Sequence, residues 1–131
     1  MTLREAIREY IVQLDNDVSL LKYKIDLYQT YVDMEEEKHQ MIGSCQTLEN
    51  VISELYSMLG RGMSKMTLKE YRELLESRIA NLARTAGEMA EESEIYEEDL
   101  ASLSGEIFGY NQVLRDLKER DYVPKHERTE L

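Results

Sequence analysis

The sequence is poor in the residues that cross-link, bend or terminate a chain. Its 131 residues include one proline, one cysteine, six glycines, one phenylalanine and no tryptophan. So few turn-forming residues argue against an all-β domain, which needs many turns. The single thiol, Cys45, excludes an internal disulfide and a zinc site built from several thiols. The composition instead favours one small helical domain.

Positive charge and long apolar runs are also scarce. The chain has 16 Lys and Arg against 27 Asp and Glu, and its net charge is −11. Such a chain repels phosphate backbones, so we expect no direct nucleic-acid binding and a basic protein as the partner. No stretch approaches 18 apolar residues, and the first residues lack the apolar core of a signal peptide. We therefore expect no membrane association and an intracellular, cytoplasmic location.

The main positive signal is an apolar repeat of seven residues. In the first half of the chain it comprises Ile7, Ile11, Leu14, Val18, Leu21, Ile25, Tyr28 and Val32. In the second half it runs without a phase break from Leu68 to Leu117. A strict repeat of this kind is typical of helices that supercoil around a partner helix. The sequence therefore predicts two long helices, over about residues 2–59 and 67–120.

A turn at residues 60–66 separates the two predicted helices. Gly60 suits the end of a helix, and Thr67 with Glu70 fits a capping box that opens the next one. Two arms of similar length around this turn predict an all-α fold, an elongated antiparallel helical hairpin that forms a coiled coil. This single domain covers residues 1–121, and residues 122–131 are expected to form a flexible C-terminal tail.

The continuity of the first helix is open at the sequence level. The phase of its repeat shifts by one residue near Gly43 and Ser44, where the helix is expected either to continue or to break. A break there would give three helices instead of two. In the hairpin register, Ile11 faces Leu117 and Val18 faces Tyr110, which centres the fold on the predicted turn.

A second apolar stripe on the first helix predicts a helical partner. It consists of Leu20, Leu27, Met34 and Met41, which recur every seven residues, with Tyr31 beside them. A two-stranded seam does not need these residues, so we expect another helix to pack on them. Homodimerisation of two hairpins into a four-helix bundle is the simplest product. A helix of a different partner, or a stripe left exposed in a monomer, are the alternatives.

Acidic residues gather at mid-length of both predicted helices and form an acidic belt. They are Asp33, Glu35, Glu36 and Glu37 on the first helix, and Glu88, Glu91, Glu92, Glu94, Glu97, Glu98 and Asp99 on the second. Lys38 is the only basic residue among them. The belt either keeps the protein in solution or docks a basic partner. For docking, the candidate residues are Glu91, Glu92, Glu94, Glu97, Glu98 and Asp99. Mimicry of a phosphate backbone is one form of such docking.

Signals for catalysis are weak. The chain has no glycine-rich phosphate loop and no G-x-S-x-G motif, and its two histidines are His39 and His126. Glu36-x-x-His39, with Glu91 or Glu92 on the facing helix, has the parts of a di-metal carboxylate bundle. The motif is short and frequent by chance in a Glu-rich chain, so a polar layer that fixes helix register is the competing interpretation. We expect no metal and no cofactor.

These observations predict a non-catalytic coiled-coil interaction protein, such as a scaffold, adaptor or chaperone-like protein, that binds partners through helical surfaces. One alternative is an acidic inhibitor or nucleic-acid mimic that blocks a basic nucleic-acid-binding protein. A weaker alternative is a di-metal carboxylate enzyme. The expected partners are a second copy of the chain and another protein, and no small-molecule substrate is expected.

Overall fold

The computed structural model describes residues 2–30, 34–60, 67–91 and 97–119, and these residues form four helices. They are α1 (Leu3–Tyr28), α2 (Glu35–Gly60), α3 (Leu68–Glu91) and α4 (Glu97–Glu119). The all-α class predicted from the sequence is therefore confirmed. None of the four helices is both long and apolar enough to cross a membrane.

The prediction of two long helices is wrong at the middle of each. The first predicted helix is divided into α1 and α2 between Tyr28 and Glu35, and the second into α3 and α4 between Glu91 and Glu97. The outer bounds agree better, since α2 ends at Gly60 and α3 begins at Leu68. Most of the predicted turn and all of the predicted tail lie outside the described residues.

Local hydrogen bonds explain where α1 and α3 begin and where α1 ends. The hydroxyl of Thr2 accepts a hydrogen bond from the backbone N–H of Glu5, and that of Thr67 accepts one from the N–H of Glu70. At the other end of α1, the Thr30 hydroxyl donates to the carbonyl of Leu27 at 2.8 Å. A side chain that bonds back in this way satisfies a terminal carbonyl and competes with continuation of the helix.

The acidic belt explains the other two helix starts. Glu35, Glu36 and Glu37 occupy the first turn of α2, and Glu98 and Asp99 lie in the first turn of α4. Carboxylates are favourable at this position because the first backbone N–H groups leave a partial positive charge there. Much of the acidic belt that the sequence placed at the middle of two long helices therefore lies at the N-termini of two shorter helices.

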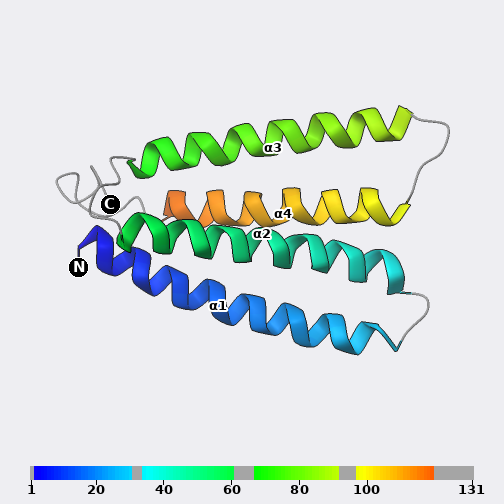
Figure 1. The fold of residues 1–131 in the computed structure, drawn as a ribbon, viewed down its shortest axis with the longest axis horizontal. Coiled ribbons are helices and arrows are strands. Elements are labelled where there is room, and N and C mark those ends of the chain that lie inside the picture. The colour runs from blue at the N-terminus through cyan, green and yellow to red at the C-terminus, as the bar shows by residue number, and fades with distance from the viewer. Residues whose placement is uncertain (1, 31–33, 61–66, 92–96, 120–131) are drawn as a thin grey trace.

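The four helices form a bundle in which α2 and α4 lie side by side in the middle (Figure 1). These two helices run in the same direction, while α1 packs against α2 and α3 packs against α4 in the opposite direction. Each long helix of the predicted hairpin is thus replaced by two antiparallel helices. The antiparallel arrangement of α1 and α4 that the hairpin predicted is kept. Tyr10 donates a hydrogen bond to Asp116 at 2.9 Å, and Gln112 donates one to Asp17 at 3.3 Å.

Glycine brings the backbones of α2 and α4 into direct contact. A Cβ atom on Gly43 would lie 2.1 Å from the carbonyl oxygen of Ser102, and one on Gly105 would lie 1.9 Å from that of Gln40. The Ser44 hydroxyl also donates to the carbonyl of Gly105 at 2.7 Å. The predicted alternative of a break near Gly43 is therefore wrong. This glycine lies inside α2, where the close approach of α4 leaves no room for a side chain.

The hydrophobic core lies toward one end of the bundle, which we call the closed end. There the first residues of α1 and α3 meet the last residues of α2 and α4 (Figure 1). The largest fully buried side chains are Leu3, Ile7, Tyr10, Ile11, Leu14, Leu48, Val51, Leu55, Leu68, Tyr71, Leu75 and Leu117. On α1 the buried positions stop at Val18, and on α3 they stop at Leu75.

A polar network ties α2, α3 and α4 together beside this core. Arg78 donates to both carboxylate oxygens of Glu54, at 2.7 and 2.5 Å, and Tyr71 donates to the same carboxylate at 3.2 Å. The Arg78 guanidinium also lies 5.8 Å from the centre of the Tyr110 ring. Paired with Glu54, Arg78 has a raised pKa, and burial raises the pKa of Tyr71. The closed end is therefore fixed by directional contacts as well as by apolar packing.

The opposite end, which we call the open end, is packed much less tightly. It contains the last turns of α1 and α3 and the first turns of α2 and α4, and α1 and α3 tilt away from the central pair there (Figure 1). Seam residues that the sequence placed in a core are only half-buried in this region, namely Leu21, Ile25, Tyr28, Ile79, Leu82, Ala86 and Met89. The side chains of Leu20 and Leu27 are 53% and 45% exposed.

Candidate functional site

A groove between α1 and α4 opens from the middle of the bundle toward the open end. It has a volume of about 580 Å³. Its lining comprises Asp17, Leu20, Leu21, Tyr28, Glu37, Gln40, Met41, Ser44, Leu48, Ser104, Gly105, Phe108 and Gln112. Helices α1 and α4 supply the walls, and α2 supplies the floor. The hydrogen bond from Gln112 to Asp17 joins the two walls at the inner end of the groove.

The apolar surface of this groove is accessible to a partner. Phe108 on the α4 wall is 66% exposed and Leu20 on the α1 wall is 53% exposed, while Met41 on the floor is half-buried. Large apolar side chains facing one another across a depression are typical of ligand grooves and of protein interaction surfaces. The close contact of α4 with α2 at Gly43 and Gly105 explains the shape of the groove. It fixes α4 near α2, while α1 diverges from α2 toward the open end and leaves space between α1 and α4.

The groove carries negative charge at both of its ends. Asp17 lies at the inner end, and Glu37 lies in the first turn of α2 at the open end. Lysine and arginine are absent from the described residues that line it. Burial raises the pKa of Asp17, and the nearby Asp116 carboxylate raises it further, while the hydrogen bond from Gln112 acts in the opposite direction. The site therefore combines an apolar centre with acidic ends.

The structure brings two of the predicted stripe residues together. Leu20 and Met41 line the same groove, although they belong to different helices. Leu27 is exposed on α1 beyond the described lining, and Met34 is half-buried just before α2. Tyr31 lies outside the described residues. The continuous stripe is not formed, because the chain turns back between Leu27 and Met41.

Sequence reasoning assigned other lining residues differently. It placed Leu21 and Tyr28 in the helical seam and left Phe108 outside it, as either a capping contact or a binding anchor, whereas all three line the groove. The signal that locates these residues is the pair of acidic helix starts, which mark where each long helix is divided. With those divisions, α1 packs on α2 and α3 packs on α4, and the groove lies between α1 and α4.

The acidic residues predicted to dock a partner lie at the open end wherever they are described. Glu91 is the last residue of α3, and it is exposed, as are Glu98 and Asp99 on α4. Glu97 begins α4, and Glu92 and Glu94 lie outside the described residues. The described part of the belt therefore surrounds the open end of a short bundle instead of the middle of a long rod.

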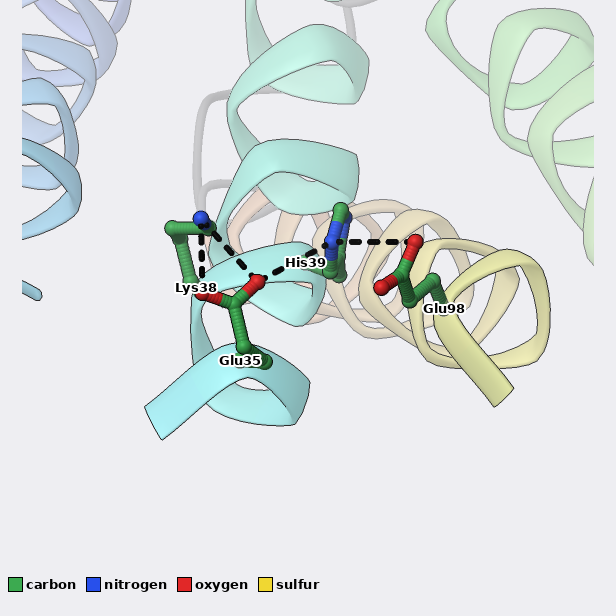
Figure 2. Close-up of polar contacts among 4 residues, drawn as sticks. All are labelled: Glu35, Lys38, His39 and Glu98. Carbon is green, nitrogen blue, oxygen red and sulfur yellow. Dashed lines mark hydrogen bonds and ion pairs between the residues drawn. The ribbon is translucent and has the colours of Figure 1, made fainter. Parts of the chain in front are cut away.

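A cluster of charged groups joins α2 to α4 at this end (Figure 2). The Nε2 atom of His39 lies 3.7 Å from a carboxylate oxygen of Glu35 and 3.7 Å from one of Glu98. Lys38 Nζ lies 3.1 Å from Glu35. His39 and Lys38 are largely covered, whereas the Glu98 side chain is 68% exposed. Gly43, one turn beyond His39, contacts Ser102, one turn beyond Glu98, so the cluster extends the central helix contact.

Among the residues that the structure describes, this cluster is also the group whose donor atoms lie close enough to hold a metal ion. Donor atoms of Glu35, His39 and Glu98 all lie within 4.8 Å of one another, and one imidazole with two carboxylates is a donor set that zinc accepts. The sequence predicts no metal, and the set that it offered for that alternative was different, since it used Glu36, which is exposed and outside this cluster. Lys38 already pairs with Glu35 on the same helix, so the contact of this cluster that joins α2 to α4 is the approach of His39 Nε2 to the Glu98 carboxylate.

The only cysteine is poorly suited to nucleophilic chemistry. Cys45 is buried in α2, and its thiol donates a hydrogen bond to Glu49 at 3.2 Å. Burial together with this carboxylate raises the pKa of the thiol to about 11, so the reactive thiolate is scarce at neutral pH.

Searches of protein-family models, of curated proteins and of solved structures found nothing that matches this chain.

Proposed function

We propose that this protein is a non-catalytic interaction protein that binds a helical segment of another protein in the groove between α1 and α4. The observation that carries the proposal is the pair of exposed apolar walls, Leu20 and Phe108, above a floor that contains Met41. Exposed apolar side chains are costly to hydrate, and burying them against a partner recovers that free energy.

The geometry favours a helix as the bound element. From Asp17 to Tyr28 the α1 wall extends for about 16 Å at 1.5 Å per residue, which equals three turns of helix. An amphipathic helix laid along such a groove buries apolar residues spaced three and four apart. A partner helix would also cover the half-buried seam residues that α1 leaves in the open half.

The alternative functions receive less support from the same geometry. A nucleic-acid mimic would present acidic residues along an extended surface, whereas the described residues of the acidic belt lie at one end of a short bundle. A di-metal enzyme needs two sets of ligands, and the described residues bring together one imidazole and two carboxylates. The acidic end therefore has a supporting role at the mouth of the groove.

The test is selection of helical peptides from a displayed library against the full-length protein. Selected peptides should bind at the groove, so NMR shifts on titration should be largest at Leu20, Met41 and Phe108. The substitution Phe108→Ala should weaken binding about tenfold or more, because it removes the largest exposed apolar contact.

A matched control is Tyr56→Ala, which removes an aromatic ring that is 57% exposed and lies outside this groove. It should leave the affinity of the selected peptides unchanged. Peptides that bind equally well to the Phe108 variant, or that shift signals on another surface, would contradict the proposal.

A further inference from the structure

We infer that the partner segment is a basic amphipathic helix, with one basic residue near each end of its apolar face. This inference rests on the proposed function and adds the chemistry of the partner. It follows from the placement of Asp17 and Glu37 at opposite ends of the apolar groove. Both carboxylates line the site, and no described lysine or arginine does.

The two carboxylates set the spacing of the charges on the partner. Asp17 is near the start of the α1 wall, and Glu37 is near the other end of the groove, where α1 finishes at Tyr28. About three helical turns separate these levels, so the basic residues on one face of the bound helix are expected about 11 residues apart. Apolar residues fill the turns between them, opposite Leu20, Met41 and Phe108.

The surroundings of Asp17 support a cationic partner. Its carboxylate lies close enough to Asp116 to be affected by its charge, and α4 provides an amide donor, Gln112, at this point. Tyr10 already donates a hydrogen bond to Asp116. A guanidinium or ammonium group that reached the inner end of the groove would relieve the repulsion between the two acids, which makes this position favourable for a cation.

The net charge of the whole chain also favours a basic partner. With a net charge of −11, the protein attracts basic segments at long range and repels acidic ones. Glu36, Glu98 and Asp99 are exposed at the open end, near the mouth of the groove. A second copy of this chain carries the same charge, so self-association through the groove is electrostatically disfavoured.

The experiment compares three designed helical peptides of 14 residues with one shared apolar face. Arginine occupies positions 2 and 13 in the first peptide, glutamine in the second and glutamate in the third. Fluorescence anisotropy with the full-length protein should rank them arginine, glutamine, glutamate. We expect the arginine peptide to bind about tenfold more tightly than the glutamine peptide at low salt, and the advantage to shrink in high salt.

Protein variants then locate the charges. Asp17→Asn and Glu37→Gln should each weaken the arginine peptide about threefold and leave the glutamine peptide unchanged. Asp15→Asn is the matched control, because Asp15 is exposed two residues away on α1 and faces outside the groove. It should change neither affinity by more than the general effect of net charge.

The possible outcomes separate this inference from the proposed function. Equal affinity for the arginine and glutamine peptides, with both dependent on Phe108, would overturn the charge inference and leave the groove as a helix site. Failure of all three peptides to bind, alongside library peptides that do bind at Phe108, would also overturn it. A dimer seen by sedimentation that Phe108→Ala dissociates would assign the groove to a second copy and overturn the inference.

Discussion

The closed and open ends of the bundle are built from the same seven-residue repeat but are packed very differently. Leu14 on α1 is fully buried, whereas Leu21, one repeat further along the same helix, is half-buried beside the groove. On α3 the contrast is the same between Leu75 and Leu82. An apolar repeat therefore predicts which residues face the other helices, but it does not predict how closely those helices approach.

The difference arises from what holds each end. The closed end has a continuous core and the Glu54–Arg78 pair. In the open half, α2 and α4 stay in close contact at Gly43 and Gly105, while α1 and α3 diverge from them (Figure 1). Segments with few buried apolar contacts open at low free-energy cost and are the usual source of binding surfaces. The closed end therefore holds the buried core, whereas the exposed apolar walls of the groove lie toward the open end.

The largest effect is expected from filling the contact between α2 and α4. In Gly105→Ala the new Cβ would lie 1.9 Å from the carbonyl oxygen of Gln40, so the two helices must separate. We expect a loss of about 3 kcal/mol or more in the free energy of unfolding, measured by urea denaturation.

The control for this substitution is Gly87→Ala on α3. A Cβ on Gly87 would meet nothing within 4 Å, so alanine should stabilise the protein by up to about 1 kcal/mol through helix propensity alone. If both variants lose the same stability, the close approach of α2 and α4 is wrong.

A second pair of substitutions tests the two ends directly. Leu14→Ala removes a fully buried side chain at the closed end and should cost about 3 kcal/mol. Leu21→Ala makes the same chemical change one repeat later, where the side chain is half-buried, and should cost about 1 kcal/mol.

Urea denaturation of both leucine variants measures the difference. Similar losses at the two positions would mean that α1 is packed equally along its length, and the contrast between the ends would not hold.

The sequence predicted the helical class, the cap at Thr67 and the helix end at Gly60, because each depends on local chemistry. It also placed Ile11, Val18 and Leu117 in a core, where the structure buries them. The repeat could not show that each long helix is divided, since apolar spacing on either side of a turn can stay in phase. The acidic residues at Glu35 and Glu97 carried that information as helix starts.

The groove could not be predicted from the repeat, because it depends on an approach distance. Gly43 and Gly105 set that distance, and they are 62 residues apart in the sequence. The sequence offered Gly43 as a break, since an isolated glycine weakens a helix. Only the position of α4 shows that the absence of a side chain is needed there for contact.

The smallest predicted effect concerns Asp17, which lies at the inner end of the groove, between the closed and open ends of the bundle. Its pKa is raised in the folded protein by burial and by Asp116, so the folded state holds the proton to a higher pH than the unfolded chain does. The stability contributed by the protonated group is fully present below the unfolded pKa and is lost as pH rises through the folded pKa. Asp17→Asn should therefore be more stable than wild type at neutral pH, by on the order of 0.5 kcal/mol after solvent screening.

The gain should disappear below about pH 3, where both forms are uncharged at this position. Urea denaturation of the variant and wild type across pH 2.5–7 measures it, with Asp15→Asn as the exposed control on the same helix. A variant less stable than wild type at pH 7 would show that the hydrogen bond from Gln112 outweighs the repulsion by Asp116. If the same substitution both stabilises the free protein and weakens the arginine peptide, Asp17 contributes to binding at the expense of stability in the free protein.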